Sequence, residues 1–112
     1  MDDCLFCRIV RGEIPSTKVA DSATCLAFRD IAPKAPVHVL VIPRTHYDSA
    51  NDVSDAAVVG EMVLLAKEVA RAERILDAGY RMVINTGVDG GQTVGHLHLH
   101  VLGGRGLKWP PG

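Results

Sequence analysis

The sequence has few aromatic residues, no long apolar run and no excess of either charge. Aromatic side chains make up 4% of the 112 residues, so a core must be built mainly from Val, Leu, Ile and Ala. The formal net charge of −1 provides no basic surface for a nucleic-acid duplex or an anionic membrane. No apolar run approaches the ~20 residues that span a bilayer. A phosphorylated ligand would therefore have to be bound by local groups.

The chain also shows no signal-sequence pattern and has few cysteines. Its start, Met1-Asp2-Asp3, is acidic and lacks the basic and then apolar layout of a secretory signal. Three cysteines are an odd number, which disfavours a disulfide framework and favours reduced thiols. We therefore expect a cytoplasmic protein. Because 47% of the residues are hydrophobic and no linker or repeat divides the chain, residues 1–112 are expected to fold as a single domain.

Apolar and turn-forming residues alternate along the chain as in an α+β protein. Residues 4–12 predict a short helix that ends at Gly12, and residues 55–76 predict one long helix with Ser54 as its N-cap. The predicted strands cover residues 18–20, 24–29, 37–42, 80–85 and the segment that begins at His96. The almost continuous apolar run at 37–42 is typical of a central strand covered on both faces. This order favours a mainly antiparallel sheet with helix packed on it.

Three histidines, His96, His98 and His100, lie at alternate positions in an otherwise aliphatic segment. A period of two predicts a strand with all three imidazoles on one face. A single histidine in a strand is more often a packed or surface residue, but burying three polar rings requires several partners. A chemical role is therefore favoured, either as a metal centre or in nucleophilic attack on phosphorus by the middle histidine.

A glycine-rich loop at residues 85–95 precedes the histidines and favours the phosphate interpretation. Glycines let backbone N–H groups approach an anion, and Asn, Gln and Thr add neutral hydrogen bonds. A metal-dependent hydrolase would carry an aspartate shortly after the histidines, whereas Val, Leu and two glycines follow here. Metal-dependent hydrolysis is therefore less favoured than nucleophilic attack on phosphorus, and it ranks third among the functions considered.

The motifs resemble the signature of the histidine triad (HIT) superfamily. The resemblance is carried by Gly91-Gln92-Thr93-Val94 and the histidine segment, with further matches at Gly12-Glu13-Ile14-Pro15, Ala27-Phe28-Arg29-Asp30-Ile31, Val41-Ile42-Pro43 and Tyr80-Arg81-Met82-Val83. The ending, residues 102–105 and 109–112, is similar to the HINT branch, the histidine-triad nucleotide-binding proteins. Histidine at position 100, in place of glutamine, separates the chain from the related galactose-1-phosphate uridylyltransferases.

This resemblance implies a HIT-like fold, in which a mainly antiparallel five-stranded sheet with one long and one short helix joins a second sheet across a homodimer. It implies a purine nucleotide-binding hydrolase or nucleotidyl transferase that cleaves nucleoside phosphoramidates, such as adenosine 5'-phosphoramidate, through a covalent nucleotidyl-histidine. The C-terminal residues 107–112 would lie near the partner's active site. The alternatives are a dinucleoside polyphosphate hydrolase of the Fhit type and a nucleotide-binding scaffold protein with little turnover.

The resemblance also implies roles for individual residues. His98 would be the nucleophile, His96 would orient it partly through its carbonyl, and His100 and His38 would hydrogen-bond the phosphate. The implied nucleotide-binding residues form a purine pocket, a ribose acceptor and the phosphate and leaving-group contacts. They are Phe6, Ile9, Ile14, Phe28, Asp30, Ile31, Leu40, Asn85, Gly91, Gln92, Thr93, His98 and His100.

A second group of residues concerns metal binding. Cys4 and Cys7 have the spacing of a metal-ligand pair, which by itself is a weak signal. Some bacterial HIT proteins combine this pair with a histidine after the Ile-Pro strand and with the first triad histidine to hold zinc. His46 and His96 occupy those positions here, so the resemblance implies a closed structural zinc site. Cys25 is expected in the core.

Overall fold

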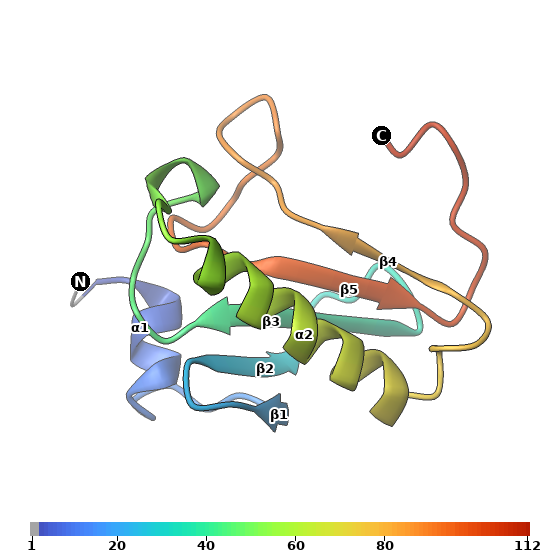
Figure 1. Ribbon diagram of the computed structural model, residues 1–112, viewed down its shortest axis with the longest axis horizontal. Coiled ribbons are helices and arrows are strands. Elements are labelled where there is room, and N and C mark those ends of the chain that lie inside the picture. The colour runs from blue at the N-terminus through green and yellow to red at the C-terminus, as the bar shows by residue number, and fades with distance from the viewer. Residues whose placement is uncertain (1–2) are drawn as a thin grey trace.

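Five antiparallel strands form one sheet in the order β1-β2-β3-β5-β4 (Figure 1). The computed structural model describes residues 3–112, so part of the acidic start of the chain used above lies outside the described residues. The strands are β1 Lys18–Asp21, β2 Cys25–Arg29, β3 Val37–Pro43, β4 Tyr80–Val83 and β5 Leu99–Gly103. The helices are α1 Leu5–Val10, the 3₁₀ turn η1 Ala50–Asp52 and α2 Ala56–Ala72. The predicted α+β architecture with one short and one long helix is confirmed.

The two helices pack on opposite faces of the central strand β3. Val39 and Val41 belong to the core beneath α2, whereas Leu40 and Ile42 belong to a second cluster with Phe6 of α1. This alternation confirms that the apolar run at 37–42 is a strand buried on both faces. Cys25 is in the α2 core, as expected. No helix in residues 3–112 has the length and hydropathy needed to cross a membrane.

Helix α2 is shorter than predicted at both ends. Its N-cap is Asp55, not Ser54, because the Asp55 side chain accepts a hydrogen bond from the Ala57 amide. At the other end, Arg74 adopts a left-handed conformation with φ +62°, and the Ile75 amide donates to the Ala70 carbonyl. This arrangement stops the helix, so the apolar residues that follow continue the core from a turn.

The histidine segment enters the sheet later than predicted. The ladder between β3 and β5 starts at the pair Val41 and Leu99, whereas the Leu97 amide donates to the carbonyl of Tyr47. The predicted alternation still holds, because Leu97, Leu99 and Val101 point into the α2 core and the histidines point to the other face. Strand β4 likewise ends at Val83, two residues before the predicted limit.

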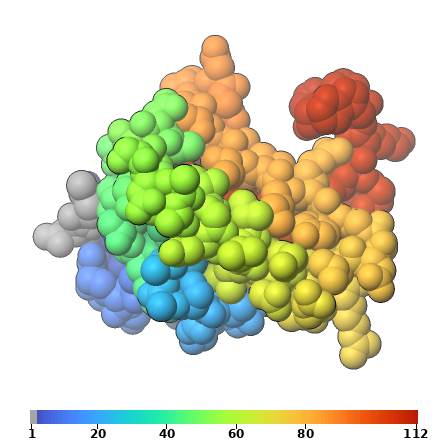
Figure 2. Space-filling view, in the orientation of Figure 1, coloured from blue at the N-terminus to red at the C-terminus, as the bar shows by residue number. Residues whose placement is uncertain are grey.

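Strand β4 and the C-terminal segment form the least covered side of the molecule. The main contacts of α2 are with β1, β2, β3 and β5, and Figure 1 shows β4 beyond the helix. Figure 2 shows the C-terminal residues projecting from the body of the molecule. Within this segment Trp109 is 82% exposed, and the Arg81 guanidinium of β4 donates to the Lys108 carbonyl.

Candidate active site

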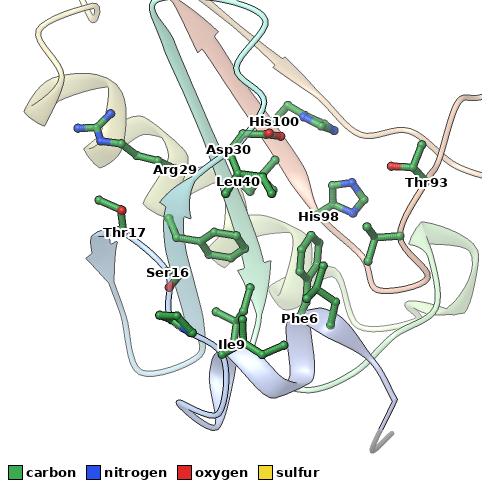
Figure 3. A pocket seen from close by; sticks show the side chains of 16 residues that line it. Phe6, Ile9, Ser16, Thr17, Arg29, Asp30, Leu40, Thr93, His98 and His100 are labelled. Atoms are coloured by element: carbon green, nitrogen blue, oxygen red, sulfur yellow. The ribbon is translucent and has the colours of Figure 1, made fainter.

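A cavity of about 730 Å³ opens on the α1 face of the sheet, between α1, β2, β3 and the histidine segment (Figure 3). The predicted site residues that line it are Phe6, Ile9, Ile14, Phe28, Asp30, Ile31, Leu40, Thr93, His98 and His100. The sequence interpretation missed further lining residues, which are Leu5, Pro15, Ser16, Thr17, Arg29 and Val94. They lie on the same segments as predicted residues, and Pro15, Arg29 and Val94 belong to the motifs that carry the HIT resemblance, although no role was predicted for them. Most of the lining is apolar, and Asp30 is its one carboxylate among the described residues.

The position of the proton on His98 is set by the backbone of its own strand. The Nδ1–H group of His98 donates to the His96 carbonyl at 2.8 Å. In the neutral ring the Nε2 atom therefore carries a lone pair. The edge of the Phe6 ring packs against the imidazole, with centroids 5.3 Å apart and planes at 84°. Figure 3 shows His98 on the side of the cavity where Phe6 and Thr93 also lie.

His38 and His100 form a hydrogen-bonded pair with a defined direction. The Lys34 amide donates to His38 Nδ1 at 3.0 Å, so this nitrogen has no proton. His38 Nε2 must then carry the proton and donate to His100 Nδ1 at 2.8 Å. Consequently His100 has its proton on Nε2, a buried atom with no hydrogen-bond partner in the described chain.

Both rings of this pair are held in the neutral form. Burial and the neighbouring rings of His98 and His38 lower the pKa of His100 to about 4. Burial also lowers the pKa of His38, against the opposing effect of the Asp30 carboxylate 3.5 Å away. His38 does not line the cavity, and both of its nitrogens are engaged within the protein. Of this pair, only His100 lines the cavity.

The glycine-rich loop contributes less to the cavity than predicted. Asn85, Gly91 and Gln92 do not line it. The Gln92 side chain accepts a hydrogen bond from the Gly87 amide and donates to the carbonyls of Asp48 and Val94. All three bonds are to backbone groups, so Gln92 fixes the loop and connects it to residues 46–48.

The four residues of the predicted metal site lie together. The ligand atoms of Cys4, Cys7, His46 and His96 are within 4.8 Å of one another. His96 Nδ1 is 3.4 Å from the Cys4 sulfur and 3.6 Å from the Cys7 sulfur, and His46 Nδ1 is 3.3 Å from the Cys7 sulfur. Cys4 is also the N-cap of α1, which places both sulfurs at the start of that helix. These four side chains can hold a metal ion.

Asp30, His38 and His100 also bring potential ligand atoms together, but they do not make a metal site. His38 Nε2 carries the proton that it donates to His100, so it offers no lone pair to a metal ion. This group is therefore a cluster joined by hydrogen bonds, of which Asp30 and His100 line the cavity and His38 does not.

Comparison with known proteins places this geometry in a family. The HIT domain profile matches residues 11–107, which is most of the chain and includes all three alternate histidines. The chain belongs to the HIT domain family. Cys4 and Cys7 lie before the matched region, so the metal-ligand set joins an N-terminal pair to two histidines of the HIT domain.

Relatives of this HIT chain cover almost its whole length. A HIT-like protein of Synechococcus elongatus is 50% identical over 99% of this chain and 98% of its own length. The crystal structure of a HIT family hydrolase from Legionella pneumophila has a TM-score of 0.95 and 49% identity, and covers 98% of this chain and 100% of that one. A histidine triad nucleotide-binding protein from Candida albicans has a TM-score of 0.84 and 31% identity, over 96% of this chain and 83% of that one. The five-stranded α+β fold is thus the fold of solved HIT structures.

Proposed function

We propose that the chain is a purine nucleotide-binding hydrolase of the HINT branch that cleaves nucleoside phosphoramidates through a covalent nucleotidyl intermediate on His98. The observation that carries this proposal is the lone pair on His98 Nε2 beside an apolar cavity, next to the unpartnered Nε2–H of His100. A nucleophile and a hydrogen-bond donor side by side are what attack on a phosphoryl group requires. Similarity to a histidine triad nucleotide-binding protein from Candida albicans also supports it.

The cavity accounts for each part of such a substrate. The purine would pack among the apolar side chains, including Phe6 and Phe28, and the ribose hydroxyls would donate to the carboxylate of Asp30. The phosphate would then meet His98 and His100. Asn85, Gly91 and Gln92 would act on this substrate only through the conformation of the loop that they form.

In the first step His98 Nε2 attacks phosphorus and the bond from phosphorus to the leaving amine breaks. The amine leaves with a proton taken from water, and the positive charge that forms on the His98 ring is stabilised by the His96 carbonyl at Nδ1. His100 Nε2–H donates to a non-bridging phosphate oxygen. In the second step water attacks phosphorus and the bond to His98 Nε2 breaks, with its electron pair returning to Nε2. The attacking water gives up a proton to the solvent, which balances the proton taken in the first step, and the nucleoside monophosphate is released. In the first step the Thr93 hydroxyl, on the same side of the cavity as His98, would donate to the leaving group.

The test is hydrolysis of adenosine 5'-phosphoramidate by the wild type and by His98→Asn and His98→Ala. We expect a loss of at least about 10³-fold in kcat for both variants, because the nucleophile is removed. Wild-type enzyme denatured under alkaline conditions, which preserve a phosphorus–nitrogen bond, should show the added mass of one adenylyl group, and the variants should not. Undiminished hydrolysis in either variant would exclude His98 as the nucleophile.

Two further outcomes separate the alternatives. Faster turnover of diadenosine polyphosphates than of the phosphoramidate would favour a hydrolase of the Fhit type. Binding of adenosine monophosphate by a wild type without turnover would favour a nucleotide-binding scaffold protein.

We propose that the metal of the Cys4, Cys7, His46 and His96 group is zinc. A tetrahedral zinc ion, with Zn–S bonds of about 2.3 Å and Zn–N bonds of about 2.0–2.1 Å, separates its two nitrogens by about 3.3 Å and a nitrogen from a sulfur by about 3.5 Å. The corresponding distances here are 3.1 Å between the nitrogens and 3.3–3.6 Å from nitrogen to sulfur. With four protein ligands the ion would be structural, and it would fix the residue whose carbonyl orients His98. The three free cysteines suit a reducing, cytoplasmic location.

We also propose a homodimer in which β4 of one copy lies beside β4 of the other. The outer edge of β4 is unpaired in residues 3–112, and all four of its residues are half-buried. On the outer side of α2, Val63 and Leu64 are 38% and 59% exposed. A second copy would cover both surfaces and would give the projecting Trp109 segment a place to dock.

A further inference from the structure

Arg105, which follows β5, forms a hydrogen bond with the loop between β2 and β3. Its Nη2–H group donates to the Lys34 carbonyl at 2.9 Å, and its Nη1–H group donates to the Gly106 carbonyl at 3.0 Å. Gly104 beside it has φ +87° and approaches Pro36 so closely that a Cβ would lie 2.8 Å from the Pro36 Cβ. The turn after β5 therefore holds the loop in one place, and no step of the proposed reaction uses these contacts.

The same loop residue reaches a buried histidine with its other backbone group. The Lys34 amide donates to His38 Nδ1 at 3.0 Å. The loop is braced from within, because the Ala32 amide donates to Asp30 and the Lys34 ammonium donates to the Ala32 carbonyl. The Lys34 amide thus donates to His38, and the Lys34 carbonyl accepts from the Arg105 guanidinium.

The Lys34 amide determines which of two tautomer combinations His38 and His100 adopt. The 2.8 Å contact between His38 Nε2 and His100 Nδ1 holds one proton, which either ring can supply. If His38 supplies it, His100 has its proton on Nε2, a buried atom of a residue that lines the cavity. If His100 supplies it, His100 Nε2 has a lone pair and His38 must carry a proton on Nδ1. That second arrangement would direct two N–H groups at each other across 3.0 Å, at the Lys34 amide.

We propose that the backbone amide of Lys34, held in place by Arg105, fixes the tautomers of His38 and His100 and thereby presents an N–H group to the bound phosphate. Lys34 and Arg105 are positioning residues, because neither touches the phosphate and both act through the histidine pair. The proposal depends on the proposed function only in naming phosphate as the group that His100 meets. With the other tautomer, a nitrogen lone pair would face the phosphate oxygens and repel them.

The first test reads the tautomers directly, by ¹⁵N NMR of protein labelled at the imidazole nitrogens. In the wild type, His38 and His100 should each show an unprotonated Nδ1 and a protonated Nε2. Lys34→Pro removes the amide hydrogen and should introduce the second tautomer at both rings, whereas Lys34→Ala retains the amide and should keep the wild-type tautomers. A protonated Nδ1 on His100 in the wild type would overturn the proposal, as would identical tautomers in the two variants.

The second test links the tautomer to substrate affinity. Only molecules with the correct tautomer bind productively, so the apparent affinity falls in proportion to their fraction. For Lys34→Pro relative to Lys34→Ala we expect kcat/KM to fall by about two- to tenfold, carried by KM and matching the tautomer fraction measured by NMR. If the substitution only damaged the loop, the fall in kcat/KM would not match the tautomer fraction measured by NMR.

Arg105 provides a second pair of variants if Lys34→Pro does not fold. Arg105→Met removes the donor to Lys34 and should populate the second tautomer, and Arg105→Lys keeps a donor and should restore part of the wild-type signal. Unchanged tautomers in Arg105→Met would exclude the role of Arg105. The NMR experiment needs no substrate, so it stands even if His98 proves not to be a nucleophile.

Discussion

The Nδ1 atoms of His46 and His96 lie 3.1 Å apart, and the opposite nitrogen of each ring contacts an oxygen acceptor. His96 Nε2–H donates to the Pro43 carbonyl at 3.0 Å, and His46 Nε2–H donates to the Asp48 carboxylate at 2.7 Å. In neutral rings both Nδ1 atoms therefore hold lone pairs, which repel at this distance unless a cation lies between them. The outer hydrogen bonds thus prepare the two rings as metal ligands.

The first prediction is one zinc ion per chain in protein purified without added metal, measured by elemental analysis. Cys4→Ser/Cys7→Ser should lose the ion, and its Tm should fall because the binding free energy no longer stabilises the folded state. Cys25→Ala is the matched control, since Cys25 is buried in the other core and this variant should retain its zinc. Wild-type protein without stoichiometric zinc would refute the assignment.

Most of the fold could be predicted from the sequence because it follows from local periodicity. The face of the sheet on which each side chain lies was predicted correctly for the alternate histidines and for the run at 37–42, since a strand places successive side chains on opposite sides. The N-cap of α2 was misplaced by one residue because Ser54 and Asp55 are both good caps. Its end was misplaced because the apolar pattern continues to Leu76, which packs against the core after the chain has left the helix.

The site was less predictable, because its protons depend on backbone groups that are distant in sequence. The carbonyl of Pro43 and the amide of Lys34 set the tautomers of His96 and His38, and neither partner has a sequence signal. His38 was expected to bind phosphate, but the loop before β3 occupies one of its nitrogens and His100 the other. The sequence alone could not show that both nitrogens of His38 have partners within the protein.

The second prediction concerns the pH dependence of stability. In the folded state burial lowers the pKa of His100 to about 4, whereas an unfolded histidine titrates near 6.5. Between these values the unfolded state binds more protons, so the free energy of unfolding should fall as the pH decreases from about 6.5 to about 4. Urea unfolding across this range should show a smaller slope for His100→Asn than for the wild type. Equal slopes would contradict the assignment of His100 as a ring kept neutral by burial.

The third prediction is that Arg74→Gly stabilises the protein. Arg74 has φ +62°, a conformation that costs a residue with a Cβ about 1–2 kcal/mol, and glycine avoids this cost. Glycine also gains freedom in the unfolded chain, so we expect a net increase of about 0.5–1 kcal/mol in the free energy of unfolding. Ala72→Gly, two residues earlier and within α2, should instead lower it by about 1 kcal/mol. Urea denaturation of the three proteins measures both changes, and a destabilised Arg74→Gly would show that the side chain outweighs the strain.

The fourth prediction tests the homodimer. Sedimentation equilibrium of the wild type should give twice the chain mass at micromolar concentration, because a second copy would cover the unpaired edge of β4 and the exposed Val63 and Leu64 of α2. In a two-fold interface every substitution occurs twice, so Leu64→Glu would bury two carboxylates near each other and should give a monomer. Ala23→Glu, in the turn between β1 and β2 at the opposite edge of the sheet, adds the same charge and should leave the dimer intact. A monomeric wild type, or dissociation by Ala23→Glu alone, would show that β4 and α2 do not form the interface.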